Sequence, residues 1–341
     1  KEIKITIMMS NTPIHIIAEA RSNHNDSIEK AQKLIRIAAN SKADSVKFQL
    51  INTWGLYLPG KYPYGGYDIE DVLKFRKECE FTDEEFKSLF EYAKELDITL
   101  SASIFDLDGL HLLSSLNPPY IKIASTDLNN LRLLRATIET GQKVVLSTGM
   151  STLKEIEVAV KEFEKRGNSN FVLLHCVSVY PATLEISNVG FVETLKKTFG
   201  CEVGFSDHTP GAEAACMALT LGATWFEKHF TEDKSQKGLD HKYALVESEL
   251  SAYVETLHFA KAALAPKETK ITAEERHTME RARRSLYSNK DLPVGYVLTD
   301  DDILCVRPSN VFSAADFDFL VGKQLVKSIS QYEPFTSEHL Q

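Results

Sequence analysis

Several features that would mark common protein classes are missing from this 341-residue chain. Its five cysteines include no C-x-x-C pair, which argues against a disulfide framework or a thiolate zinc site and fits a reducing cytosol, so we expect a cytoplasmic protein. No apolar run approaches the roughly 18 residues of a membrane span, and the first residues lack the apolar core of a signal peptide. The formal charge of −9 argues against a nucleic-acid partner. We therefore expect neither a membrane nor a nucleic acid among its partners.

The glycine motifs of nucleotide-binding proteins are missing too. Neither G-x-G-x-x-G nor G-x-x-x-x-G-K-[ST] occurs where a predicted strand meets a predicted helix, which argues against a dinucleotide or P-loop site. The composition that remains is that of an ordinary globular protein, with 43% hydrophobic and 26% charged residues.

Short β-branched segments alternate with longer amphipathic segments from residue 15 to about residue 264. The eight predicted strands span residues 15–20, 45–50, 99–105, 120–125, 143–149, 171–177, 202–208 and 224–230. The segments between them have helical periodicity, and several begin at a capping residue, such as Ser27, Thr82 and Thr152. Strands that alternate with helices imply parallel βαβ units. Eight such units in about 250 residues favour an α/β fold of the (β/α)8 TIM-barrel type over an open doubly wound sheet.

The composition and pattern of the sequence change after the predicted barrel. We expect a barrel domain over residues 1–265, a polar linker with some helix over 266–283, and a small β-rich module over 284–341, with a helical segment near 314–320. A module of this size without disulfides is marginal alone, so it is expected to pack on its own barrel or on a partner subunit. Within the barrel, the long aromatic and Gly/Pro-rich connection between Leu50 and Phe81 is interpreted as a lid or substrate-facing loop.

Polar residues concentrate where the predicted strands end. In a TIM barrel the active site forms at the carboxyl ends of the strands. The polar residues at or just after those ends are Glu19, Lys47, Gln49, Ser101, Ser103, Lys122, Ser125, Ser147, Thr148, His175, Ser178, Tyr180, Ser206, Asp207, His208, Glu227, Lys228 and His229. Core packing has no need for so many polar ends, so together they indicate a titratable, anion-binding cavity.

Two lysines and two histidines carry most of this interpretation. Lys47 and Lys122 on separate strands, with the serine hydroxyls, would make a phosphate and carboxylate clamp. His208 and His229 end adjacent strands, so their imidazoles could share one divalent ion and leave positions open for water or substrate. Taken singly, each lysine is as consistent with a structural salt bridge as with a ligand-binding group. Each histidine, taken singly, is also consistent with a core residue whose hydrogen bonds are satisfied. The histidine spacing by itself is no zinc or iron signature.

A set of ordered motifs resembles the N-acetylneuraminate (sialic acid) synthase family, which includes legionaminate, pseudaminate and spore-coat polysaccharide enzymes. The motifs are IAEARSNHND (17–26), VKFQ (46–49), YIKIAS (120–125), LSTGMSTLKEIE (146–157), LLHCVSVYP (173–181), GFSDHTPG (204–211), EKHFTEDKS (227–235), GLDHK (238–242) and RSLYSNKDLPVG with VRPSN (284–310). The last of these resembles the family's antifreeze-like (β-clip) domain.

The resemblance implies a transferase that condenses phosphoenolpyruvate with an N-acylated amino-sugar aldehyde, such as N-acetylmannosamine, giving a 3-deoxy-nonulosonate and phosphate for polysaccharide biosynthesis. It implies that Glu19, Lys47, Lys122, His208 and His229 are catalytic, with the two histidines as ligands of Mn²⁺ or Mg²⁺. The residues implied to bind or face the substrates are Gln49, Ser103, Ser125, Asp127, Ser147, Ser178, Tyr180, Ser206 and Asp240. Arg307 would reach the barrel of a second subunit, which implies a homodimer with domain-swapped modules.

The chain departs from the family pattern at several positions. Ala20 and Arg21 stand where Ile-Gly often follows the strand-one glutamate, Asp26 and Thr126 each replace a glycine, and the usual S-T-P-F of strand three is Ser101–Phe105. These changes leave the acceptor sugar undetermined among N-acetylmannosamine, its 6-phosphate and a 6-deoxy-diacetamido hexose. Two other functions remain open: a class I aldolase with a Schiff base on Lys47, Lys122 or Lys228, and a non-catalytic sugar-binding protein.

Overall fold

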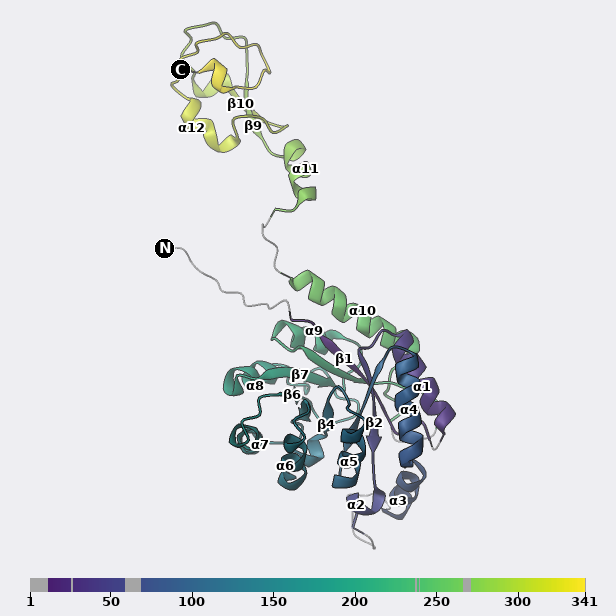
Figure 1. The fold of residues 1–341 in the computed structure, drawn as a ribbon. Helices are drawn as coiled ribbons and strands as arrows, with labels where there is room; N and C mark the ends of the chain where they lie inside the picture. Colours follow the sequence, from purple (N-terminus) through teal and green to yellow (C-terminus); the bar gives the residue numbers. More distant parts are fainter. Residues whose placement is uncertain are drawn as a thin grey trace. The chain divides into compact units, whose positions relative to one another are not determined.

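Eight parallel strands close into a barrel in chain order, because β1 pairs with both β2 and β8 (Figure 1). The strands are β1 (His15–Arg21), β2 (Ser45–Leu50), β3 (Thr99–Ile104), β4 (Ile121–Ile123), β5 (Val144–Ser147), β6 (Phe171–His175), β7 (Glu202–Asp207) and β8 (Trp225–His229). The predicted (β/α)8 barrel is therefore confirmed. This computed structural model describes residues 12–25, 27–58, 69–236, 238, 240–265 and 271–340. Asp26 and the middle of the Leu50–Phe81 connection lie outside the described residues.

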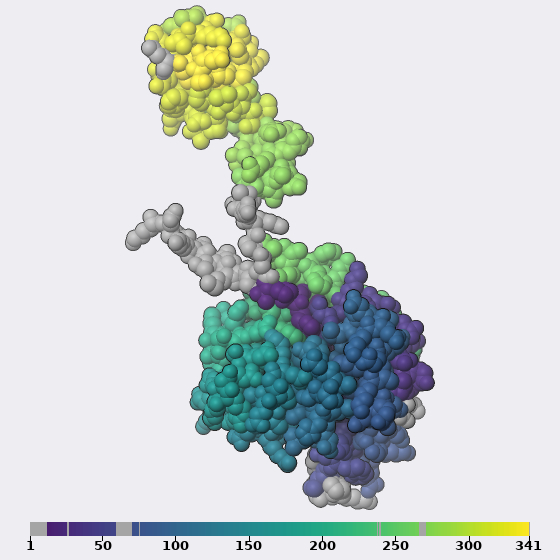
Figure 2. All heavy atoms as spheres, in the orientation of Figure 1, coloured from purple at the N-terminus to yellow at the C-terminus, as the bar shows by residue number. Residues whose placement is uncertain are grey.

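Helices follow the strands and surround the barrel. They are α1 (Ile28–Asn40), α2 (Thr53–Leu56), α3 (Ile69–Glu78), α4 (Asp83–Glu95), α5 (Leu107–Ser115), α6 (Leu131–Glu139), α7 (Leu153–Lys165), α8 (Phe191–Phe199), α9 (Glu213–Thr220) and α10 (Glu247–Leu264). Ser27, Thr82 and Thr152 cap α1, α4 and α7 as predicted, each accepting a backbone N–H of the first turn. Neighbouring helices such as α1 and α4 pack together, and their side chains form a continuous surface (Figure 2).

The barrel has two apolar layers that leave one end free for polar groups. Most of the core lies between the strands and the surrounding helices. A smaller cluster fills the barrel interior toward the strands' amino ends, formed by Ile17, Tyr120, Val145, Val172, Leu174 and Trp225. Because this plug occupies the lower interior, the polar residues further along the same strands collect at the carboxyl end.

Strand β4 is shorter than predicted. It ends at Ile123, and the chain turns at once into a short 3₁₀ helix, Ser125–Asp127. The segment predicted to continue the strand to residue 125 therefore becomes a loop at the carboxyl end of the barrel.

Residues 266–341 form a second unit with its own core. It contains α11 (Ala273–Ala282), the antiparallel pair β9 (Ser285–Ser288) and β10 (Ile303–Val306), and α12 (Phe317–Leu320). The predicted helical segment near residues 314–320 is thus confirmed, as the 3₁₀ turn Ala314–Asp316 followed by α12. Of the helices in the described residues, none is both long and apolar enough to cross a membrane.

Candidate active site

Two glutamates and two lysines meet inside the carboxyl end of the barrel. Glu19, Lys47, Lys122 and Glu227 come from β1, β2, β4 and β8, and all four are at most 5% exposed. Side chains alternate along a strand, so residues two apart on β8 both point inward: Glu227 and His229 do, while Lys228 points out. Lys228 instead forms an ion pair with Asp207 at 2.8 Å.

The four charges form one connected network. Lys47 Nζ contacts a carboxylate oxygen of Glu19 and lies 3.5 Å from Glu227 Oε2. Lys122 Nζ lies 3.9 Å from the same oxygen of Glu227. The second oxygen of Glu19 accepts the backbone N–H of Arg21 at 2.7 Å. The two lysines are therefore paired with two carboxylates in this structure.

The pKa values of this network follow from burial opposed by its charges. Burial raises the pKa of Glu227, but Lys122, Lys47 and the Ser206 hydroxyl outweigh it and lower the value to about 2. Burial also lowers the pKa of Lys47 to about 7, although attraction to Glu227 opposes that shift. Glu227 is thus ionised at neutral pH.

Serine hydroxyls surround the charged network. Ser103 Oγ accepts from Lys47 Nζ at 2.8 Å, and Ser147 Oγ accepts from Lys122 Nζ at 2.7 Å. Ser206 Oγ donates to Glu227 at 2.7 Å. These three contacts place every hydroxyl next to a charged group in a water-poor interior, where hydroxyls can bind the oxygens of an incoming phosphate or carboxylate.

Gly149 leaves room for two further hydroxyls. Its backbone N–H donates to Ser125 Oγ at 3.0 Å. A Cβ atom at this position would lie 2.5 Å from Ser178 Oγ, 2.8 Å from Ser125 Oγ and 2.8 Å from Cys176 Sγ. Only glycine lets these side chains approach so closely, so the STG sequence after β5 serves the packing of the site.

His208 and His229 lie side by side with ring centroids 5.3 Å apart. His208 Nδ1 is 2.6 Å from the carbonyl oxygen of Val177, and Nδ1–H donation to that carbonyl would leave Nε2 as the free lone pair. Burial is the main cause that lowers the pKa of His208 to about 4, and it also sets the pKa of His229 well below the ordinary range. Both rings are therefore neutral at pH 7.

This pair fits a divalent cation as a partial ligand set. Metal-binding imidazoles are neutral and orient themselves through their second nitrogen, as His208 does. His229 Nδ1 is buried without a hydrogen-bond partner, which an additional ligand at this end of the site would explain. Within the described residues, no group of three or more His, Cys, Asp or Glu side chains is arranged to hold a metal. The histidines would thus supply two ligands, and substrate and water the others.

A cavity of about 1080 Å³ lies next to the histidine pair. Ser178, Tyr180, Asp240 and Tyr243 line it, with Arg21 between them. Arg21 forms an ion pair with Asp240 and donates to Tyr243 Oη at 3.2 Å. Burial lowers the pKa of Arg21, but Asp240 more than compensates, so the guanidinium keeps its charge. The Tyr180 ring lies 4.1 Å from the His208 ring, which joins this cavity to the histidine pair.

A family model described as the NeuB family matches residues 34–269, more than half of the chain. The chain belongs to the NeuB family. A second family model, the SAF domain, matches residues 283–341. The resemblance inferred from the ordered motifs is thereby confirmed, and it extends over both units of this NeuB protein.

Relatives of known name match this NeuB chain over nearly its full length. N,N'-diacetyllegionaminic acid synthase of Campylobacter jejuni is 35% identical over 326 residues, covering 93% of this chain and 97% of the relative. Pseudaminic acid synthase of Helicobacter pylori is 30% identical and covers 96% and 98%. The crystal structure of N-acetylneuraminic acid (sialic acid) synthetase from Leptospira borgpetersenii has a TM-score of 0.71 at 33% identity, covering 80% of this chain and 92% of that one.

Arg21 has a backbone conformation that is unusual for a residue with a side chain. Its φ of 49° is in the left-handed region, which glycine adopts freely and a longer side chain only at a cost. The register of β1 against β2 also shifts between Glu19 and Arg21. This bend in the backbone places the Arg21 guanidinium in the wall of the cavity.

The structure gathers most of the predicted site residues of the barrel at the carboxyl ends of its strands. The gathered ones are Glu19, Lys47, Gln49, Ser103, Lys122, Ser125, Ser147, Ser178, Tyr180, Ser206, His208, His229 and Asp240. Asp127 is occupied locally, accepting from Thr126 at 2.8 Å and Asn130 at 3.2 Å. Arg307 lies exposed on the C-terminal unit. His175, noted at the end of β6, points away from the interior and is 2.9 Å from the carbonyl of Ser187.

Three residues without a predicted catalytic or binding role contact members of the candidate site: Glu227, Arg21 and Arg76. The inward orientation of Glu227 could be inferred from the sequence, because Glu227 is two residues before the inward-facing His229 on the same strand. Arg21 was visible as a departure from the family pattern, but its ion pair with Asp240 joins residues far apart in the chain. Arg76 lies on α3 within the long connection, and its contacts carry no sequence pattern.

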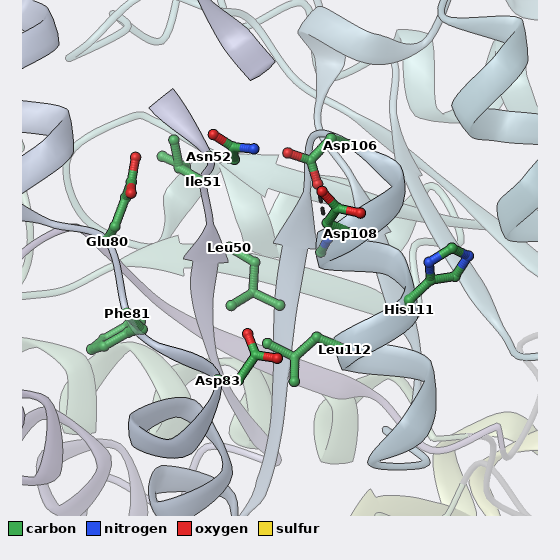
Figure 3. Close-up of a pocket in the computed structure, with 11 residues that line it drawn as sticks. Leu50, Ile51, Asn52, Glu80, Phe81, Asp83, Asp106, Asp108, His111 and Leu112 are labelled. Carbon is green, nitrogen blue, oxygen red and sulfur yellow. Dashed lines mark hydrogen bonds between the residues drawn. The ribbon is translucent and has the colours of Figure 1, made fainter. Parts of the chain in front are cut away.

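A second cavity of about 410 Å³ lies outside the barrel interior, between the ends of β2 and β3 and the helices α4 and α5. Glu80, Asp83, Asp106 and Asp108 line it (Figure 3). Asp106 caps α5 by accepting the Gly109 N–H at 2.8 Å, and Glu80 accepts the Thr53 N–H at 2.7 Å. Its carboxylates make this cavity unfavourable for anions.

Proposed function

We propose that this protein condenses phosphoenolpyruvate with an N-acylated amino-sugar aldehyde to give a sialic-acid-like 3-deoxy-nonulosonate and phosphate. The observation that carries the proposal is the buried network of Glu19, Lys47, Lys122 and Glu227. A cavity of about 1080 Å³ lies nearby, and the Tyr180 ring in its wall packs on His208. Family membership and relatives named as synthases of legionaminic and pseudaminic acids support it.

The proposed reaction forms a carbon–carbon bond and a carbon–oxygen bond to water, and it breaks the carbon–oxygen bond to phosphate. Carbon 3 of phosphoenolpyruvate attacks the aldehyde carbon, whose oxygen takes up a proton as positive charge develops on carbon 2. Water adds to carbon 2 and loses a proton, and the tetrahedral intermediate then expels phosphate to leave the keto group. Glu19 is the candidate that orients or deprotonates this water. Lys47, Lys122 and the surrounding serines hold the phosphate and carboxylate oxygens.

His208 and His229 would hold Mn²⁺ or Mg²⁺ at the aldehyde end of the site. A bound divalent ion would polarise the aldehyde oxygen as a Lewis acid. The chain's own contribution is to keep both imidazoles neutral by burial and to fix His208 through the Val177 carbonyl.

A phosphate-release assay tests the proposal. With phosphoenolpyruvate and Mn²⁺, at least one of N-acetylmannosamine, its 6-phosphate and a 6-deoxy-diacetamido hexose should release phosphate. Treatment with EDTA should abolish release, and Mn²⁺ should restore it. Borohydride with pyruvate should trap no adduct on lysine, whereas a class I aldolase would be modified. Absence of release with all three sugars would overturn the substrate class.

We further propose a homodimer in which Arg307 of each subunit completes the sugar site of the other. Arg307 is exposed on the C-terminal unit, and among the described residues it forms no ion pair, so its guanidinium is free to bind a substrate. Arg307→Ala should lower kcat/KM about 10–100-fold, the loss typical of a hydrogen-bonded charge.

Mixing two inactive variants tests the exchange between subunits. Glu19→Gln and Arg307→Ala homodimers are each impaired, but a mixed dimer would contain one barrel with Glu19 that receives the intact Arg307. Statistical reassortment should recover about a quarter of the wild-type activity. If Arg307 served its own barrel, mixing would recover nothing.

A further inference from the structure

Arg76 is a buried guanidinium in the wall of the sugar cavity. It lies on α3 and is only 7% exposed. Its Nη1 donates to Ser22 Oγ at 3.1 Å and to Gln49 Oε1 at 3.4 Å, and its Nε is buried without a hydrogen-bond partner. Both of these acceptors are neutral, and within the described part of the chain no carboxylate pairs with Arg76. A buried cation without a counter-charge is costly, so an anion that enters the cavity would be strongly favoured.

The charges around the cavity leave Arg76 uncompensated. Four cationic side chains line it, together with two acids, Asp240 and Glu249. Arg21 pairs with Asp240, and Lys234 pairs with Glu249 at 2.6 Å. Of the described lining residues, Arg76 and the exposed Lys242 are the cations left over. The cavity is therefore electropositive although the chain as a whole carries −9.

The position of Arg76 indicates that an anion bound to it would belong to the acceptor sugar and not to phosphoenolpyruvate. Arg76 lines the same cavity as Tyr180 and Asp240, which are proposed to face the sugar. Lys47, Lys122 and Ser206, proposed to hold phosphoenolpyruvate, do not line it. The cavity between β2, β3, α4 and α5 is lined by four acids, so it is unfavourable for an anion.

We propose that Arg76 is a specificity-determining residue that binds an anionic substituent, a phosphate or a carboxylate, on the acceptor sugar. The inference rests on the proposed condensation with an amino sugar and names the class of that sugar. A guanidinium offers planar, paired N–H donors that match either group. The unpartnered Nε of Arg76 is available for such a contact, and Lys242 adds long-range attraction.

Steady-state kinetics with matched acceptors test the assignment. The acceptors are neutral N-acetylmannosamine, its 6-phosphate and N-acetylmannosaminuronic acid, so that phosphate and carboxylate are separate arms. We expect wild-type kcat/KM to be higher for one of the charged sugars. Arg76→Gln should lower kcat/KM for that sugar about 10–100-fold. The value for the neutral sugar and the KM for phosphoenolpyruvate should stay within about twofold, and Arg76→Lys should recover part of the loss.

Arg36→Gln is the matched control, because Arg36 on α1 donates only to Tyr92 on the outside of the barrel. It should behave as wild type with every acceptor. If Arg76→Gln lowered kcat/KM equally for charged and neutral sugars, Arg76 would be structural. If it raised the KM for phosphoenolpyruvate, the anion bound by Arg76 would belong to phosphoenolpyruvate and not to the sugar. Either result overturns the inference. Calorimetric binding of the charged sugar to folded Arg76→Gln, at wild-type affinity, would overturn it independently of turnover. If the wild-type protein releases no phosphate with any of the three acceptors, the proposed function itself fails.

Discussion

Glu19→Gln is expected to lower kcat by about 10²–10⁴-fold, the range typical of general acid–base catalysis, while phosphoenolpyruvate still binds. Glu19 is 2% exposed and is held from both sides, by Lys47 and by the Arg21 backbone N–H. These contacts fix the carboxylate beside Lys47, which is proposed to hold phosphoenolpyruvate. An amide of the same size would fill the space without accepting a proton.

Phosphate-release kinetics and calorimetric binding of phosphoenolpyruvate separate the two effects. Glu162→Gln provides the control, because Glu162 is also buried and ion-paired, to Arg135 at 2.8 Å, but it lies on α7 outside the barrel. That variant should lose stability without losing kcat per folded molecule. Wild-type kcat in Glu19→Gln would remove Glu19 from the chemistry. A loss of phosphoenolpyruvate affinity with unchanged kcat would make it a binding residue.

The barrel was predictable from the sequence because its signal is local. Eight apolar segments separated by amphipathic helices imply parallel βαβ units, and the polar residues at their ends imply a site at the carboxyl end. In contrast, the pairing of the polar groups is not determined by a local sequence pattern. That Lys47 meets Ser103, and Lys122 meets Ser147, depends on the register between neighbouring strands, which the pattern of residues leaves open.

The charge balance of the site was harder to predict for the same reason. Lys47 and Lys122 suggested a clamp for phosphate and carboxylate because the sequence does not show which way Glu227, Lys228 and His229 each point from β8. Alternation along that strand turns Glu227 inward and Lys228 outward, and closure of the barrel brings Glu227 to both Lys47 and Lys122. The long connection also folded further than expected: its described parts form α2 and α3, which carry Tyr57 and Arg76 to the cavity wall.

Glu227→Gln is expected to lower the free energy of unfolding by about 3–5 kcal/mol, the cost of breaking a buried ion pair. The substitution would leave Lys47 and Lys122 with Glu19 as their remaining carboxylate in the network. The pH dependence should follow from the lowered pKa of Glu227. Its ordinary value is 4.5 and its folded value is about 2, so the stabilisation is complete above pH 4.5. The gap between variant and wild type should therefore narrow as pH falls from 4.5 toward 2.

Urea unfolding with and without phosphoenolpyruvate measures how the substrate replaces this charge. A bound phosphoenolpyruvate anion would neutralise the excess lysine in Glu227→Gln, so it should stabilise the variant more than it stabilises wild type. Asp207→Asn is the control, because Asp207 balances the buried Lys228 away from the interior. Its stability loss should be unaffected by the substrate. If phosphoenolpyruvate rescued both variants equally, or neither, the two lysines could not be the groups that exchange a glutamate for the substrate's charge.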